Sequence, residues 1–268
     1  MYKISETFQP RLIVHLAAQA GVRYSLDNPR AYIDTNIVGT FNVLELAKDL
    51  GIEHLLMAST SSVYGANTSM PFHEGQLINT PLTVYAATKA STEALAHSYA
   101  HIHKLPVTMF RFFTVYGPWG RPDMALFKFT RGIINEEPID IYNHGQMKRD
   151  FTYVDDLVFA IMQLLRQVPI INKPVSNKDS LSRAAPFRIV NIGNSTSVNL
   201  MDFVYALEEK LGKAAIKNMM EMQTGDVPAT WADASLLEEL ISFRPNTGIK
   251  HGISQFVDWY LDYYTNDV

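Results

Sequence analysis

Residues 54–65 have the sequence HLLMASTSSVYG, in which a short apolar run passes directly into a cluster of hydroxyl side chains. The apolar part, His54–Ser59, is typical of a strand that is buried on both faces of a parallel sheet. Leu12–Ala17 and Val107–Phe112 have the same apolar character, and we predict two further strands of this kind there. These three segments decide the expected fold.

Helices are expected between these strands. From Pro29 to Leu50 the apolar residues recur at spacings of three and four, and Gly51 follows where a helix C-cap is expected. A second helix is predicted over Tyr85–His103. Strands that alternate with helices indicate right-handed β-α-β units, so we predict an α/β fold with a parallel sheet.

The second half of the chain has shorter elements and more proline, glycine and methionine. Helices are predicted at Asp155–Arg166, Asn199–Leu211 and Ile249–Tyr264, a strand at Arg188–Ile192, and a polar surface loop at Pro169–Pro186. We therefore predict a first domain over residues 1–116 and a smaller lobe over residues 117–268, with some segments of the lobe returning to the first domain.

The composition limits the classes of function. The 268 residues are 47% hydrophobic, enough for a sizeable core, and a net charge of −4 with scattered Lys and Arg argues against a nucleic-acid partner. The absence of cysteine excludes disulfides and thiolate metal sites, and we predict no metal. Without a membrane-length apolar run or a signal-peptide pattern, we expect no membrane partner and a cytoplasmic location.

Tyr85 and Lys89 place a phenol and an ammonium on one face of the predicted helix. A nearby ammonium favours the phenolate, which a tyrosine needs to remove a hydroxyl proton near neutral pH. Taken alone, such a pair is more often chance, and the hydroxyl cluster after residue 58 is more often a solvated turn. Their order along the chain, with the cluster at the carboxyl end of a strand, favours a catalytic site.

Four longer motifs follow the same order: HLAAQAGVR (residues 15–23), RFFTVYGPWGR (111–121), RDFTYVDD (149–156) and GDVPAT (225–230). Together with the Tyr-x-x-x-Lys helix they resemble the extended short-chain dehydrogenase/reductase family, above all its UDP-glucuronate 4-epimerases. The resemblance covers nearly the whole chain. It implies a Rossmann-like, doubly wound parallel sheet with a smaller substrate-binding α/β lobe, and it assigns the catalytic roles to Thr60, Tyr85 and Lys89.

The resemblance also implies which residues hold NAD and a UDP-sugar. The cofactor-binding set is Leu16, Ala17, Ala18, Gln19, Asn36, Ser59, Tyr85, Lys89, Phe112 and Val115. The substrate-binding set is Arg23, Thr60, Ser61, Ser62, Thr114, Arg121, Arg149 and Asp226. Arg149 resembles an arginine that grips the diphosphate with its planar fork. The competing interpretation of each lone charged residue is a surface salt bridge.

The two residues after Thr60 help to choose the reaction. Relatives that dehydrate or decarboxylate the sugar carry acidic residues there, whereas this chain has Ser61 and Ser62. The resemblance therefore implies epimerisation at C4, from UDP-glucuronate to UDP-galacturonate through a 4-keto intermediate. Dehydration or decarboxylation is the alternative within the enzyme class.

The glycine-rich turn that receives the pyrophosphate in dinucleotide folds is not found before Leu12. By comparison with the family we expect an N-terminally truncated sheet in which Leu12–Ala17 has an unpaired edge. Two hypotheses stay open: an active epimerase, or an inactive remnant that binds only a UDP-sugar. The family also implies a homodimer through the helices near residues 29–50 and 85–103.

Overall fold

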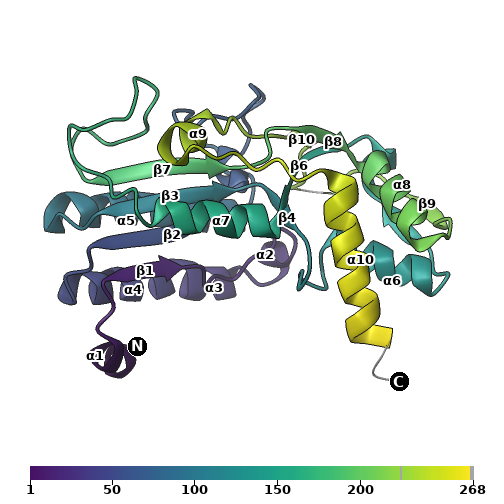
Figure 1. The fold of residues 1–268 in the computed structure, drawn as a ribbon, viewed down its shortest axis with the longest axis horizontal. Coiled ribbons are helices and arrows are strands. Elements are labelled where there is room, and N and C mark those ends of the chain that lie inside the picture. Colours follow the sequence, from purple (N-terminus) through teal and green to yellow (C-terminus); the bar gives the residue numbers. More distant parts are fainter. Residues whose placement is uncertain (224, 266–268) are drawn as a thin grey trace. The chain divides into compact units, whose positions relative to one another are not determined.

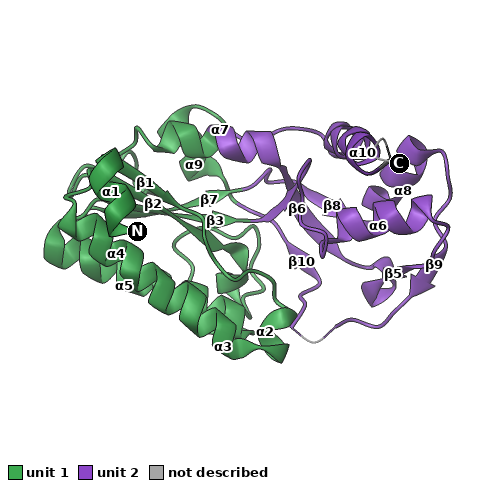
Figure 2. Ribbon diagram, turned by 90° about the horizontal axis from the view of Figure 1, so that it is seen from below, with its two compact units in different colours: residues 1–112, 160–192, 233–243 green, residues 113–159, 193–232, 244–268 purple. Residues whose placement is uncertain are grey.

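The structure, a computed structural model, describes residues 1–223 and 225–265. The chain divides into two compact units (Figure 2). The first contains residues 1–112, 160–192 and 233–243, and the second contains residues 113–159, 193–232 and 244–268. The first unit thus breaks off at Phe112, before the predicted boundary at residue 116, and two later segments return to it.

A parallel sheet forms the centre of the first unit (Figure 1). Its strands, in spatial order, are β1 (Leu12–His15), β2 (His54–Thr60), β3 (Val107–Phe112) and β7 (Phe187–Ile192). The predicted α/β fold is confirmed. The register places Thr60 beside Phe112, and Phe112 beside Ile192, so the carboxyl ends of three strands are level.

The strand β1 departs from the prediction. It ends at His15 rather than Ala17, and Leu12 and Val14 are 41% and 38% exposed, so the expected burial on both faces is wrong. The reason is its place in the sheet: among the described strands β1 pairs only with β2, whereas β2 and β3 each have two neighbours. A short unpredicted helix, α1 (Tyr2–Phe8), precedes β1.

Two long helical segments run along one face of this sheet (Figure 2). The predicted helix at Pro29–Leu50 consists of α3 (Pro29–Tyr32), a π-helical stretch η1 (Ile33–Val38) and α4 (Gly39–Asp49). The second segment is α5 (Val84–His103), as predicted. Apolar side chains of α4 and α5 pack on those of β2 and β3 in one buried cluster, which drives this layer together.

The segment Pro169–Pro186 contains no regular helix or strand, and most of its residues from 172 to 184 are exposed, in agreement with the predicted surface loop. The side chain of Asp179 is the exception, because it is buried. Asp179 binds Arg188 of β7, with 2.9 Å between Oδ1 and Nε, and the two side chains are only 0% and 4% exposed. Arg188 was predicted to lie in a strand, and its charge explains why the Asp179 side chain points inward: a buried guanidinium needs a paired carboxylate.

The second unit has its own small sheets and a largely aromatic core. Strands β10 (Ala229–Thr230), β6 (Lys148–Tyr153) and β4 (Thr114–Tyr116) lie in that order, β8 (Ser197–Asn199) pairs antiparallel with β6, and β5 (Ile139–Ile141) pairs with β9 (Lys217–Met219). The helices are α6 (Ala125–Ile134), α8 (Leu200–Leu211) and α10 (Ile249–Thr265), while α7 (Val154–Leu164) has residues in both units. Of these helices only α6 was not predicted.

Candidate active site

Thr60 is the last residue of β2 and is 8% exposed. Its Oγ1 accepts a hydrogen bond from the Ser62 backbone N–H at 3.2 Å and donates to Ser62 Oγ at 3.3 Å. This caps the short 3-10 turn η2 (Ser61–Tyr64). Thr60, Ser61 and Ser62 are therefore held together at the carboxyl edge of the sheet, where open α/β folds bind ligands.

The helix α5 carries Tyr85 in its first turn. It begins there because the Thr83 hydroxyl accepts a hydrogen bond from the Ala86 N–H at 3.2 Å, a standard N-cap. Lys89 follows one turn later, and α5 packs against both β2 and η2. The structure thus brings the helix with Tyr85 and Lys89 against the strand end and turn that carry the hydroxyl cluster.

Lys89 is 5% exposed, which is unusual for an ammonium. Burial lowers its pKa from 10.5 to about 8, and the negative charge of Glu93 one turn later opposes this change. A buried amine in this state suits a ligand that offers oxygen acceptors.

His15 lies at the end of β1, and its Nε2 is 3.2 Å from Thr40 Oγ1. Burial lowers the pKa of His15 to about 4, and the positive charge of Lys89 contributes to the same change. The ring is therefore neutral at pH 7. The end of β1 contributes no charge to the surroundings of Lys89.

The loop Leu16–Gln19 follows β1 and is exposed or partly exposed throughout. Gln19 exchanges two hydrogen bonds with the Asn36 amide, at 2.8 and 3.0 Å, and Asn36 Nδ2 also donates to Thr88 Oγ1 at 3.0 Å. Asn36 is 1% exposed and belongs to the π-helical stretch η1, a conformation often found at functional sites. Its amide ties the loop to α5.

Three other predicted residues of the first unit have different surroundings. Ser59 is 2% exposed, and its hydroxyl donates to Glu93 Oε1 at 2.5 Å. Phe112 is stacked on Phe110 with 4.8 Å between ring centroids. Arg23 is exposed immediately before the short helix α2 (Tyr24–Asp27). The Ser59 hydroxyl is therefore engaged inside the unit.

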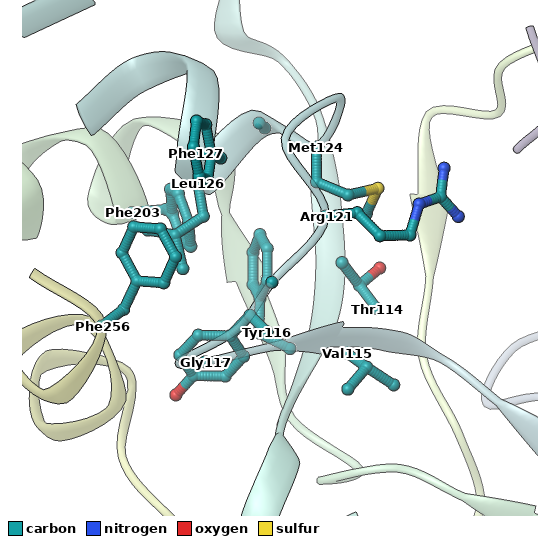
Figure 3. A pocket seen from close by; sticks show the side chains of 13 residues that line it. Thr114, Val115, Tyr116, Gly117, Arg121, Met124, Leu126, Phe127, Phe203 and Phe256 are labelled. Atoms are coloured by element: carbon teal, nitrogen blue, oxygen red, sulfur yellow. The ribbon is translucent and has the colours of Figure 1, made fainter. Parts of the chain in front are cut away.

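In the second unit, Thr114, Val115 and Arg121 line a cavity of about 50 Å³ (Figure 3). Its other end is aromatic, formed by side chains that include Phe127, Phe203 and Phe256 (Figure 3). The Arg121 guanidinium pairs with Asp123, with Nε 3.0 Å from Oδ1. Ligand sites typically measure roughly 300–1,000 Å³, so this cavity could hold only a small group.

Arg149 and Asp226 also belong to the second unit. Burial lowers the pKa of the Arg149 guanidinium, and the charge of Asp226 opposes this change, which places the two groups near each other. Arg149 Nη1 donates to the Lys148 carbonyl at 2.9 Å. A partly buried guanidinium is suited to an anion, because charge-assisted hydrogen bonds strengthen where water is excluded.

Several residues around these groups were not predicted. Tyr32 is fully buried beside Tyr85, with ring centroids 6.0 Å apart, and its hydroxyl donates to the carbonyls of Ala20 and Gly21 at 3.1 and 2.6 Å. Arg111 is 1% exposed within β3. A charged residue inside an apolar strand was the available signal for Arg111, whereas nothing in the sequence distinguishes Tyr32 from a core tyrosine.

Asp150 is the clearest omission in the second unit. It is 0% exposed, and its carboxylate accepts hydrogen bonds from the backbone N–H groups of Asn194, Ser195 and Ala232 at 2.8, 2.9 and 3.1 Å. This carboxylate joins β6 to two later segments, directly beside Arg149. The motif RDFTYVDD contains Asp150, but a motif alone does not show whether an acidic side chain is buried in the protein or binds a ligand.

Residues 1–223 and 225–265 contain neither a candidate membrane span nor a cluster of metal-binding side chains. No helix there combines the length and the apolar character needed to cross a bilayer. No group of three or more His, Cys, Asp or Glu side chains in the same residues is arranged to hold a metal ion.

Comparison with known proteins identifies the family. Residues 1–176 match the model of the NAD dependent epimerase/dehydratase family. The chain is 57% identical to Protein CapI of Staphylococcus aureus over 258 residues, covering 96% of this chain and 77% of that protein. It is 55% identical to a probable UDP-glucuronate 4-epimerase of Rhizobium meliloti over 265 residues, covering 98% of this chain and 78% of that protein.

Among solved structures, the chain resembles the UDP-glucuronic acid 4-epimerase of Bacillus cereus in complex with UDP-glucuronic acid and NAD. The TM-score is 0.86 at 31% identity, and the match covers 98% of this chain and 78% of that one. The buried Tyr85–Lys89 helix beside the hydroxyl turn, the family match and these relatives agree: the chain belongs to the NAD-dependent epimerase/dehydratase family.

Proposed function

We propose that this protein epimerises a UDP-sugar at C4 with NAD as cofactor, and that its substrate is UDP-glucuronate, converted to UDP-galacturonate. One observation carries the proposal: α5 presents Tyr85 and the buried Lys89 one turn apart, packed against the turn that holds Thr60, Ser61 and Ser62. The relatives named for UDP-glucuronate epimerisation support the choice of sugar.

The residues present fit the nicotinamide end of the cofactor. Lys89 Nζ offers donors and the Tyr85 oxygen an acceptor to the ribose hydroxyls, and the open Leu16–Gln19 loop offers small side chains and backbone groups. When bound, NAD supplies the redox chemistry, taking hydride from C4 of the sugar and returning it to the opposite face. Asn36 acts here by holding the loop, since its amide is bound to Gln19 and Thr88.

The chain's own groups perform the proton transfer. Thr60 orients the sugar 4-hydroxyl, and Tyr85 removes its proton as C4 becomes a ketone. The positive charge of Lys89 favours the phenolate that this step requires. Ser61 and Ser62 cannot act as acid or base near pH 7, but their hydroxyls can hydrogen-bond a sugar carboxylate. This favours epimerisation of a uronic acid over loss of water or of carbon dioxide.

We assign recognition of the nucleotide to the second unit. Arg149 is suited to the diphosphate, and the nearby Asp226 to the ribose hydroxyls. Thr114 and Arg121, which line the small cavity, are assigned to the sugar and the nucleotide through the family resemblance. Arg23 is assigned to the substrate through the family resemblance.

The test incubates the chain with UDP-glucuronate and added NAD and separates the products by anion-exchange chromatography. We expect UDP-galacturonate, and its absence with Tyr85→Phe, which retains the ring but not the ionisable hydroxyl. Calorimetric titration with UDP measures nucleotide binding independently. A decarboxylated or dehydrated product would contradict the assigned reaction. UDP binding without conversion would mean that this chain recognises the nucleotide but does not catalyse.

We further propose a homodimer that forms through the α4 and α5 layer, in a cytoplasmic protein. Val38, Phe41 and Ile102 are 48%, 45% and 64% exposed in these segments, which is a large apolar exposure for helices with a free face. Light scattering after size exclusion should give twice the mass of one chain, and Phe41→Glu should give the single mass. A monomeric wild type would refute the dimer.

A further inference from the structure

A fully buried ion pair lies beside the proposed catalytic groups but takes no part in the chemistry described above. Arg111 of β3 binds Glu93 of α5 through both carboxylate oxygens, with Nε 3.0 Å from Oε1 and Nη2 2.7 Å from Oε2. The side chains are 2% and 4% exposed. Such a pair gives up the hydration of two charges, so its stability alone does not explain its presence.

The pair connects the elements that carry Thr60, Tyr85 and Lys89. Glu93 Oε1 also accepts the hydroxyl hydrogen of Ser59, at 2.5 Å, and Ser59 immediately precedes Thr60 on β2. Glu93 lies one helical turn after Lys89 and two turns after Tyr85. A single carboxylate of α5 is thus hydrogen-bonded both to β3 and to the end of β2.

The arginine is itself fixed from two further directions. Its guanidinium lies 4.8 Å from the ring centroid of Tyr64, at the end of the turn η2, and Nη1 donates to the Glu74 carbonyl at 3.4 Å. The Tyr64 hydroxyl in turn donates to Asn191 Oδ1 of β7 at 2.7 Å. The network therefore extends from α5 through β3 to both ends of the hydroxyl turn.

We propose that Glu93 and Arg111 are positioning residues, which hold α5 in the one setting that places Tyr85 and Lys89 against Thr60. The catalytic role of these two residues rests on the proposed function. Whether the ion pair determines the surroundings of Lys89 can be tested without measuring enzyme activity.

The test replaces the pair as a unit, with Glu93→Gln and Arg111→Met together, which removes one charge of each sign and leaves the net charge unchanged. The matched control is Asp179→Asn with Arg188→Met, which removes the other buried pair of the first unit. Arg188 is paired with Thr108 near the start of β3, whereas Arg111 lies near the carboxyl end of that strand. Circular dichroism first establishes that both variants are folded.

The readout is the pKa of the Lys89 amine, followed by NMR in chains with labelled lysine and assigned by its loss in Lys89→Met. If α5 is released, water reaches Lys89, and the pKa rises from about 8 toward 10.5 because burial is its main cause of lowering. If α5 does not move, loss of the Glu93 charge has the opposite effect and lowers the pKa of Lys89. We expect a rise in the Glu93–Arg111 variant and no change in the control.

An unchanged or lower pKa of Lys89 in the Glu93–Arg111 variant overturns the proposal, and so does an equal rise in the control. If the double variant does not fold, Arg111→Lys makes the same test, since it keeps the charge but loses the planar fork. With an active enzyme, we expect kcat to fall by about tenfold or more with little change in KM, because about 1.4 kcal/mol of lost alignment has that effect. Failure of the epimerase assay leaves the titration result intact.

Discussion

Replacing the buried Lys89 with methionine should stabilise the chain at neutral pH while removing its proposed activity. Methionine has nearly the same length and no charge, so the change removes the desolvated ammonium and keeps the packing. A fall in the pKa of Lys89 from 10.5 to about 8 corresponds to about 3 kcal/mol of unfavourable burial of the charged form. This shift already includes the opposing attraction of Glu93, so we expect a gain of about 1–3 kcal/mol at pH 7, with the lower values if methionine packs less well than the lysine stem.

The pH dependence of this gain has a definite sign. Below pH 8 Lys89 is charged in both the folded and the unfolded chain, and the folded state bears the full cost of burial. Between pH 8 and 10.5 the folded state releases the proton first, so the unfolded chain binds more protons and the wild type gains stability. The advantage of the variant should therefore shrink steadily over this range.

The assay is urea unfolding followed by far-UV circular dichroism at pH 7, 8.5 and 9.5. Lys173→Met, at an exposed lysine of the same unit, is the control and should lie within about 0.5 kcal/mol of the wild type at each pH. Equal or lower stability of Lys89→Met at pH 7 would refute the reasoning, because the ammonium would then bear no cost of burial. A gain that does not change with pH would show that its origin is packing rather than charge.

Three further predictions concern single side chains. Asp150→Asn should destabilise the second unit by about 2–4 kcal/mol, because the new NH2 group faces backbone donors and leaves them unpaired; urea unfolding within 0.5 kcal/mol of the wild type would contradict this. Gly193→Ala should cost about 1–3 kcal/mol, since a Cβ there would lie 2.6 Å from Ala232 Cβ and 2.8 Å from Asp150 Oδ2, and an unchanged melting temperature would disprove the crowding. Arg149→Met should weaken UDP binding by about 10- to 100-fold, as expected for a lost charged hydrogen bond of about 1.5–3 kcal/mol, and equal calorimetric affinity would remove Arg149 from the nucleotide site.

The parallel sheet and its two long helices were predictable because their patterns are local. Apolar runs identify β2 and β3, and spacings of three and four identify α4 and α5. The apolar run of β1 alone predicted burial on both faces, which is wrong, because the exposure of a strand depends also on its neighbours in the sheet. The unpaired edge of Leu12–Ala17 was expected only through the family resemblance. The local pattern thus predicts the fold class but not the exposure of an edge strand.

The candidate site was likewise predictable only in part. Tyr85 and Lys89 were predicted from their spacing and Thr60 from the family resemblance, and the structure places their elements in contact. The sequence does not show whether a polar side chain binds a ligand or another residue of the protein. Ser59 and Asn36 have the right identity and place for ligand contacts, yet their side chains bind Glu93, Gln19 and Thr88. Such internal pairing depends on residues tens of positions away.

The interleaving of the two units along the chain affects how the protein can be made and divided. The sheet of the first unit is completed only by β7, and α9 (Ser235–Ile241) also belongs to it, so a ribosome must deliver most of the second unit before the first is whole. Expression of residues 1–112 alone would leave β3 without β7, one of its two neighbours in the sheet. A protease cut between the units would likewise release no self-contained half, so dissection of this molecule calls for point substitutions rather than deletion.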